Sequence, residues 1–212
     1  MSSRLYELFA DRLLVEKITR RLPHLFHYAE RDSSRAGHVG MEVGSLRERI
    51  LVSLLILKFS RENVQTELPI ALHDVDVELF GEPISVKTLT TNTPRIGPVK
   101  AIWTVDATRA RDFVQTFSPT SDYLLAHLVW EDEGGLYYVP LAVQEDVFAR
   151  LGRARYFKLP KPGTNPRGVE ISQEAMSQLV GDPRSLRIRI RWDRPTAPYD
   201  QYERWIEYWR LD

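Results

Sequence analysis

The 212-residue chain contains no cysteine, which excludes disulfides, thiolate metal sites and cysteine nucleophiles. It also lacks a long hydrophobic run. The longest one, Ile50–Leu57, is interrupted by Ser53 and is too short to cross a bilayer. The first residues, MSSRLYELFADRLL, carry charges throughout and show no apolar core or cleavage site of a signal peptide. We therefore expect a cytoplasmic protein without membrane contact.

An excess of charge is absent as well. Lys and Arg total 29, Asp and Glu total 29, and the formal net charge is zero. This argues against a general nucleic-acid coat protein, which would be strongly basic. A nuclease stays compatible with neutrality, because acids at a metal centre offset basic residues elsewhere and local patches decide binding. The chain also has no Gly-rich phosphate loop and no Gly-x-Ser-x-Gly or Ser-x-x-Lys nucleophile motif.

The residues that are present suffice for one full core, with 43% hydrophobic and 10% aromatic. Apolar periodicity predicts a helix over 3–21, and a polar segment at 30–44 predicts a loop. The run Ser45-Leu46-Arg47-Glu48 has a capping-box pattern and predicts the start of a helix that ends near Phe59. Later helices are predicted over 107–117, 144–151, 172–180 and 199–209, and strands over 67–79, 84–91, 99–105, 122–130, 136–143 and 186–192.

This order of elements predicts an α/β fold, a mixed β-sheet flanked by helices. The segment PKPGTNPRG at 160–168 is the most linker-like part of the chain. The C-terminal residues beyond it are too few to fold alone, so we expect a single domain over residues 1–212.

The most informative segment is HDVDVELFGEPISVKT, residues 73–88. Two β-rich stretches are separated here by residues with turn chemistry, which predicts a hairpin. A turn centred on Gly81 and Glu82 places Asp76 directly opposite Lys87.

Strand alternation places three acids, Asp74, Asp76 and Glu78, on one face of this hairpin. Ser85 and Lys87 share that face, and apolar residues line the other. A cluster of acids is costly unless a cation binds it. Oxygen ligands on a rigid sheet suit Mg²⁺, which takes one or two carboxylates and keeps several waters. A nearby lysine can orient the water that attacks phosphorus.

An aspartate followed about ten residues later by an acid-x-Lys element resembles the active-site pattern of the PD-(D/E)XK nucleases. Asp76 matches the aspartate, and Ser-Val-Lys at 85–87 matches the (D/E)XK element. Glu48 matches a glutamate that a preceding helix often supplies in that family. The resemblance covers about residues 45–143, the expected catalytic core of a restriction-endonuclease-like fold.

The resemblance implies a Mg²⁺-dependent type II restriction endonuclease that hydrolyses double-stranded DNA at a short palindromic site. The products it implies are 5′-phosphate and 3′-hydroxyl ends. The catalytic residues would be Asp76, Lys87, Glu48 and Ser85. Of these, Asp76 would hold the metal, Glu48 or Asp74 would complete the metal shell, and Lys87 would orient the attacking water.

The sequence departs from the family pattern in two places. No proline precedes Asp74 or Asp76, and Ser85 occupies the position of the second acid. Glu48 is the first candidate to supply the missing carboxylate, ahead of Asp74 and Glu78. Glu48 also has a purely local explanation, since the third helical position of a capping box favours glutamate.

A nuclease with one active site must pair with a copy of itself to cut both strands. We therefore expect a homodimer on a two-fold symmetric site, with a cognate DNA methyltransferase encoded nearby but not bound. One alternative is a repair or recombination nuclease of the same fold. Another is a non-catalytic DNA-binding or regulatory protein, in which Asp76 and Lys87 form an ordinary cross-strand ion pair.

Three sets of residues are candidates for DNA binding, and one of them follows Lys87 directly. They are Thr90, Asn92 and Arg95 after the hairpin, Arg187, Arg189 and Arg191 on one strand face, and Met41 as an apolar wedge. With Arg184 and Arg194, five arginines gather within eleven residues and repel each other unless an anion or acid partner is present. A solvated strand face is the competing interpretation.

The C-terminal helix carries large apolar residues at helical spacing: Tyr202, Trp205, Ile206 and Trp209. This stripe predicts packing in the core. Since tryptophan and tyrosine are also enriched at interfaces, a dimer contact is the second interpretation.

Overall fold

The computed structural model describes residues 4–35, 38–39, 42–68, 75–159, 168–196, 199–200 and 202–210. At its centre is a six-stranded sheet with the strand order β11-β8-β7-β5-β4-β3. The strands are β3 (Val64–Gln65), β4 (Val77–Leu79), β5 (Glu82–Thr90), β7 (Asp122–Leu128), β8 (Glu133–Val139) and β11 (Leu186–Arg191). The sheet is mixed, because β5 and β7 run parallel while its other neighbours are antiparallel.

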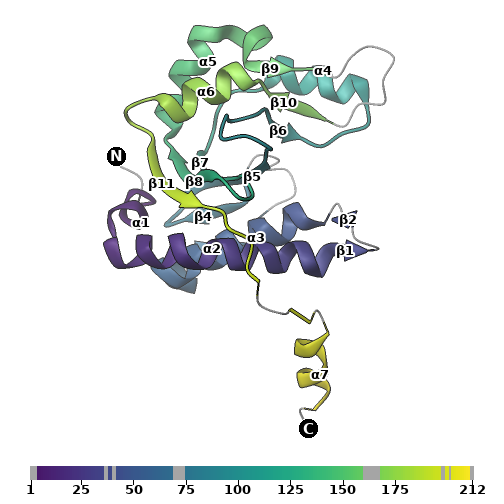
Figure 1. Ribbon diagram of the computed structural model, residues 1–212. Helices are drawn as coiled ribbons and strands as arrows, with labels where there is room; N and C mark the ends of the chain where they lie inside the picture. Colours follow the sequence, from purple (N-terminus) through teal and green to yellow (C-terminus); the bar gives the residue numbers. More distant parts are fainter. Residues whose placement is uncertain are drawn as a thin grey trace.

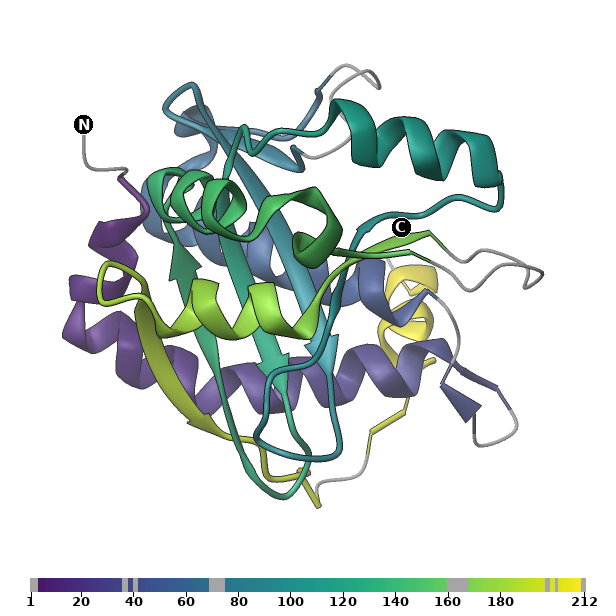
Figure 2. The same ribbon diagram turned by 90° about the horizontal axis from the view of Figure 1, so that it is seen from above.

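Helices cover both faces of this sheet (Figure 1). On one face lie α1 (Tyr6–Ala10), α2 (Arg12–Ser33) and α3 (Val43–Phe59), followed by a 3₁₀ turn at Arg61–Asn63. On the other lie α4 (Ala107–Thr116), α5 (Leu141–Tyr156) and α6 (Gln173–Gly181). Figure 2 shows α5 and α6 crossing above the strands, with α2 and α3 below. The predicted α/β class, a mixed sheet flanked by helices, is confirmed.

Two small sheets and one helix complete the described structure. The two-stranded sheet pairs β1 (Ser34–Arg35) with β2 (His38–Val39), and the three-stranded sheet has the order β6 (Val99–Ile102), β10 (Val169–Ile171), β9 (Phe157–Lys158). The last helix, α7 (Glu203–Trp209), stands away from the layers at the end of an extended segment (Figure 1). None of the helices in the described ranges is long and apolar enough to span a membrane.

The core has two parts, one on each face of the central sheet. Phe26, Leu51 and Leu55 pack against the face that α1, α2 and α3 cover. Tyr156 and Met176 belong to the part beneath α5 and α6. Each of these side chains is fully buried, and burial of one large apolar side chain contributes about 1.5–3 kcal/mol. The central strands are therefore held from both sides.

The predicted end of the second helix near Phe59 is confirmed, but its predicted start and the predicted bounds of the first helix are wrong. Asp11 caps α2, since its Oδ1 accepts a hydrogen bond from Leu14 N at 3.1 Å, and α2 continues to Ser33 into the expected loop. Helix α3 begins at Val43, so Ser45 lies inside the helix and caps nothing. The capping-box interpretation fails, and with it the local explanation of Glu48.

Other predictions hold more closely. The helix predicted over 107–117 is α4, and the cap predicted at Ser172 is confirmed, because its Oγ accepts a hydrogen bond from Ala175 N at 3.1 Å. Of the strand predicted over 67–79, Val77–Leu79 forms β4 and the other described residues, 67, 68, 75 and 76, are not in a strand; 69–74 lie outside the described residues. Residues 160–167 of the linker-like segment lie outside them too.

The predicted packing of the C-terminal stripe in the core is wrong. Tyr202, Ile206 and Trp209 are 61%, 40% and 89% exposed. Helical periodicity identifies an apolar stripe, but it does not say which surface covers that stripe.

Candidate active site

The predicted hairpin forms between β4 and β5, and its turn consists of Phe80 and Gly81. Both have positive φ, 53° and 79°, as the type I′ loop of a two-residue hairpin requires. The ring of Phe80 contacts residues outside the hairpin, and these contacts favour the positive φ at this position. It meets Phe59 edge-on at 6.0 Å, and the Arg4 guanidinium lies 4.8 Å from its centroid. The turn is therefore centred one residue earlier than predicted.

This shift changes the pairing of Asp76. Its backbone N–H donates to Ile84 O at 3.0 Å, and the observed register, with Val77 opposite Ile84 and Glu78 opposite Pro83, is displaced by two residues from the predicted one, so that Asp76 does not lie directly opposite Lys87. The predicted direct pairing of Asp76 with Lys87 is wrong. A change of this size keeps the alternation of the strands, so Asp76, Ser85 and Lys87 still share one face.

The Asp76 carboxylate is held by the strand opposite. Its Oδ2 accepts hydrogen bonds from Val86 N at 2.6 Å and from Ser85 Oγ at 3.2 Å. Lys87 Nζ lies 4.0 Å from the same oxygen. The Asp76 side chain is 39% exposed and that of Lys87 only 14%. Ser85 thus orients the aspartate by donating to it, and the carboxylate faces the solvent with its direction fixed.

Glu48 reaches the same place from α3, which packs on β5. Burial and, to a lesser extent, the negative charge of Asp76 raise the pKa of Glu48 to about 7, and the positive charge of Lys87 opposes them. The three charges therefore act on one another, and we call Glu48, Asp76 and Lys87 the acidic site. Two carboxylates share one ammonium group there. The structure brings together three of the residues that the sequence singles out.

The acidic site fits a divalent cation by its chemistry. Burial, and to a lesser extent the charge of Asp76, disfavours a charged Glu48, and a divalent cation beside the two carboxylates would favour the charged form. Mg²⁺ takes one or two carboxylates and keeps waters for its other positions. Among the described residues, no three His, Cys, Asp or Glu side chains gather as a metal site, and Asp74 lies outside those residues. Glu48 and Asp76 are thus the two described carboxylates that fit a metal.

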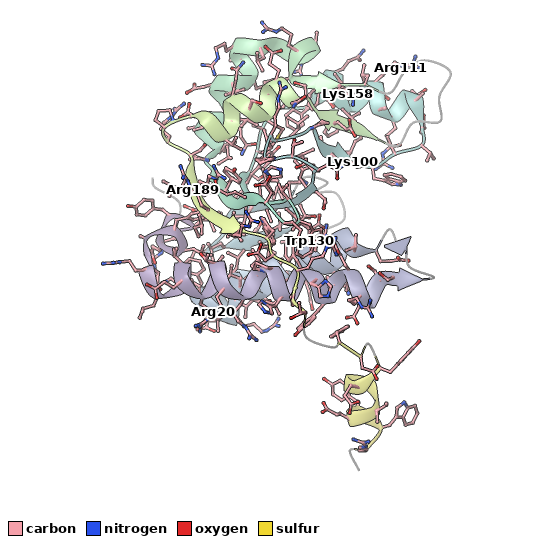
Figure 3. The ribbon with its side chains drawn as sticks, viewed as in Figure 1. Arg20, Lys100, Arg111, Trp130, Lys158 and Arg189 are labelled. Atoms are coloured by element: carbon pink, nitrogen blue, oxygen red, sulfur yellow. The ribbon has the colours of Figure 1, made fainter. Side chains whose placement is uncertain are left out.

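A second cluster of buried charge lies beside this site and is not apparent in the sequence. The Glu30 carboxylate of α2, 6% exposed, accepts hydrogen bonds from Arg47 Nη2, from Trp130 Nε1 at 2.7 Å and from Arg194 Nη1 at 3.1 Å. Trp130 lies between the sheet and α2 (Figure 3). We call these four residues the Glu30 cluster.

Arg47 connects the Glu30 cluster to the acidic site. It precedes Glu48 on α3, and its Nη1 donates to Thr90 Oγ1 at 2.8 Å, at the end of the strand that carries Lys87. The one signal in the sequence is an arginine within an apolar helix. The partners of Glu30 lie 17, 100 and 164 residues away in the chain, so no local pattern identifies them.

The candidate DNA-binding residues fall into separate places. Thr90, Asn92 and Arg95 are exposed and follow Lys87 closely, next to the acidic site. Met41 lies outside the described residues. The first group therefore lies where a molecule reaching the acidic site would meet it.

The arginine-rich strand β11 forms the opposite edge of the sheet, separated from β5 by β8 and β7. Figure 3 labels Arg189 on this strand. Carboxylates accompany the neighbouring arginines: Glu133 for Arg187, Asp193 for Arg191, Asp182 and Asp146 for Arg184, and Glu30 for Arg194. Acid partners thus account for the crowding of positive charge, and the structure does not bring this strand to the acidic site.

Comparisons with known proteins agree with this geometry. The model of the family "Restriction endonuclease ThaI" matches residues 8–211. A solved structure described as "Restriction endonuclease in complex with substrate DNA" is 52% identical to this chain, with a TM-score of 0.89. The match covers 98% of this chain and 99% of that one. A comparison with curated proteins finds no match. On the strength of a family match along nearly its whole length, the chain belongs to the ThaI restriction endonuclease family.

Proposed function

We propose that this protein is a Mg²⁺-dependent type II restriction endonuclease of the PD-(D/E)XK kind. In this proposal one nuclease domain cleaves double-stranded DNA at a short palindromic site, and two copies act together as a homodimer. The family membership supports the restriction activity. The observation that supports the metal-dependent mechanism is the acidic site, where Lys87 Nζ lies 4.0 Å from Asp76 Oδ2 and where burial and, to a lesser extent, the charge of Asp76 raise the pKa of Glu48 to about 7.

Glu48 and Asp76 would hold the metal. Glu48 supplies the carboxylate that the family pattern places at Ser85, and the Ser85 hydroxyl keeps Asp76 in position. A bound Mg²⁺ lowers the pKa of a coordinated water and stabilises negative charge that builds up on the phosphate. The exposed side of Asp76 leaves room for the waters and phosphate oxygens that Mg²⁺ keeps as its other ligands.

Lys87 would orient the attacking water. Its ammonium group is largely buried and lies 4.0 Å from Asp76 Oδ2, so its donors are confined to the same small space. The water oxygen would form a bond to phosphorus as the bond from phosphorus to the 3′-oxygen breaks. The attacking water would lose a proton to solvent, and the leaving 3′-oxygen would take up a proton from solvent. The products are a 5′-phosphate and a 3′-hydroxyl end. Preorganised charge of this kind is usually the largest contribution to catalysis.

The DNA contacts nearest to the chemistry would come from Thr90, Asn92 and Arg95. A hydroxyl, an amide and a guanidinium can each reach phosphates or base edges, and these three are exposed beyond Lys87. The solved structure 52% identical to this chain is described as a complex with substrate DNA, which supports the same partner here. A methyltransferase encoded nearby would protect the cell's own sites.

Plasmid digestion tests the proposal. The wild type with Mg²⁺ should yield discrete fragments, EDTA should abolish them, and Asp76→Ala and Lys87→Ala should each lose the activity. Lys158→Ala is the matched control, because Lys158 also pairs with a carboxylate, Glu170 at 3.0 Å, on the separate three-stranded sheet. Full cleavage by both site variants would refute the assignment.

Sequencing of the fragment ends separates the alternatives. One short palindrome at every end identifies a restriction enzyme. Nicks that depend on DNA structure instead identify a repair or recombination nuclease. Binding without cleavage identifies a regulatory protein.

A further inference from the structure

Helix α7 presents a large apolar surface that its own chain does not cover. Tyr202, Ile206 and Trp209 are 61%, 40% and 89% exposed, and the helix stands apart from both layers (Figure 1). Burial of these side chains against another surface would be favourable. A helix of seven residues is also too short to be stable by itself in water. Its sequence therefore requires a second surface to pack against.

The base of this helix is fixed to the body of the protein. Tyr199 stacks on Tyr28 of α2 with ring centroids 4.6 Å apart, and its hydroxyl donates to Asp32 Oδ1 at 2.5 Å. The segment before α7 is thus anchored on the C-terminal half of α2. Shortly after this anchor the chain enters α7, beyond the outer side of the α2–α3 layer (Figure 1).

The outer side of that layer has a matching groove between α2 and α3. Its volume is about 190 Å³, and its apolar lining includes Leu25, Leu54 and Leu57. Lys17 and Arg21 line it as well. Leu57 is 64% exposed. We call this surface the α2–α3 groove.

Charge and shape fit the helix to the groove. Exposed acids Glu203 and Glu207 lie one turn apart on α7, beside its apolar residues; Arg210 Nη1 lies 3.9 Å from Glu203 Oε1 in an exposed ion pair, so Glu207 is the acid without an ion pair among the described residues of this helix. Lys17 and Arg21 lie one turn apart on α2, beside the apolar lining. Opposite charges at matched spacing favour one docking arrangement and discriminate against others.

We propose that α7 of one copy docks into the α2–α3 groove of a second copy, and that the reciprocal contact holds the homodimer. The inference rests on the homodimer of the proposed function. A two-fold dimer uses the same patch twice, so it contains two helices and two grooves. Leu13, 79% exposed, lies on the same face of α2 as Lys17 and Arg21 and extends the apolar surface beside the groove.

A second copy is favoured over the chain's own groove. The three large side chains of α7 stay exposed although Tyr199 anchors the segment on the very helix that lines the groove. Docking within one chain would also bury only one helix and leave no surface for a partner.

The test measures the mass of the full-length protein in solution without DNA or Mg²⁺, over a range of concentrations. Ile206→Glu damages the helix, and Leu57→Glu damages the groove. Both positions are exposed, so the fold should survive, which circular dichroism checks. Leu159→Glu is the control, since Leu159 is 47% exposed and belongs to neither surface. The wild type and the control should be dimers, and each of the two variants should dissociate at least tenfold more readily.

Mixing the two variants distinguishes exchange between copies from docking within one chain. The Leu57→Glu chain has an intact helix and the Ile206→Glu chain an intact groove, so a mixed dimer regains one of the two contacts. We expect a mixed dimer tighter than either variant alone. Absence of this recovery, or unchanged dimers of both variants, would overturn the proposal. Plasmid cleavage is scored separately, so a wild type that dimerises by this route without cutting DNA would refute the function and not the interface.

Discussion

Two clusters of charge meet on helix α3, and they are built in opposite ways. In the Glu30 cluster one carboxylate receives two guanidinium groups and an indole N–H. In the acidic site two carboxylates, Glu48 and Asp76, share the single ammonium of Lys87. Arg47 and Glu48 are neighbours in sequence and belong to different clusters.

This difference suits the Glu30 cluster to stabilising the fold and the acidic site to the proposed binding of a metal ion. A buried charge that is fully paired holds the elements that supply its partners, and the Glu30 cluster joins α2, α3, Trp130 after β7 and Arg194 after β11. A site with surplus negative charge is unfavourable until a cation arrives. On α3, Arg47 pairs with Glu30 through Nη2 and with Thr90 through Nη1, and the neighbouring Glu48 belongs to the acidic site, so the first cluster holds the helix without neutralising the second.

The largest effect should follow from Glu48→Gln. This change keeps the shape of the side chain and removes the charge that would hold the metal, so cleavage at saturating DNA should fall by about a thousand-fold or more. Single-turnover rates with Mg²⁺ measure it. Glu78→Gln changes an acid of the β4–β5 hairpin and serves as the comparison, and an equal or larger loss there would contradict the choice of Glu48 over Glu78 as the second carboxylate.

The next largest effect should follow from Glu30→Ala. It leaves Arg47 buried without its partner, and breaking a buried ion pair in this way costs about 3–5 kcal/mol of unfolding free energy. Denaturant unfolding measures this loss. Glu174→Ala removes the carboxylate from an exposed pair with Arg155 and should cost far less. Equal losses would mean that the Glu30 cluster stabilises the fold no more than a surface pair does.

Removing a carboxylate charge should change the stability of the metal-free protein in opposite directions in the two clusters. The pKa of Glu48 is about 7 in the folded protein, against 4.5 for an exposed glutamate. The folded state therefore binds this proton more tightly than the unfolded state. The charged carboxylate destabilises the metal-free fold above pH 7, and this penalty disappears as the pH falls from 7 towards 4.5. Glu48→Gln should thus stabilise the metal-free protein at alkaline pH, whereas Glu30→Ala destabilises it.

Thermal melts in EDTA at about pH 8.5 and about pH 5.5 measure the difference between wild type and Glu48→Gln. The variant should melt higher at the alkaline pH, and the difference should shrink at the acidic one. The comparison cancels the contribution of His127, whose pKa is lowered to about 4 by burial and, to a lesser extent, by the charge of Arg187. Adding Mg²⁺ at alkaline pH should raise the Tm of the wild type more than that of the variant. A pH-independent difference would contradict the raised pKa.

The residues of the hairpin that form the acidic site could be predicted from the sequence, because strand alternation is a local pattern. Strand alternation has a period of two, so the shared face of Asp76, Ser85 and Lys87 survives an error in the turn. The register of the β4–β5 hairpin could not be predicted, because the turn residue Phe80 contacts Phe59 of α3 and Arg4 near the start of the chain. The α/β class followed from the order of elements in the same way.

The Glu30 cluster and the exposure of the apolar stripe on α7 could not be predicted from the sequence, for a different reason. A buried carboxylate whose donors lie up to 164 residues away leaves no spacing to recognise. The stripe of α7 has clear periodicity, but periodicity describes one surface of a contact and not its partner. Contacts distant in sequence therefore set the limit in both cases.

The smallest effect concerns the hydrogen bond that joins the clusters. Thr90→Val removes the acceptor of Arg47 Nη1 and should cost about 1 kcal/mol of stability. Trp130→Phe removes a donor to Glu30 on the far side of the same cluster and should cost a similar amount. If the Arg47–Thr90 bond keeps α3 aligned with β5, only Thr90→Val should lower kcat, by several-fold. A rise in KM with unchanged kcat would instead identify Thr90 as a direct DNA contact, because lost ground-state binding raises KM alone.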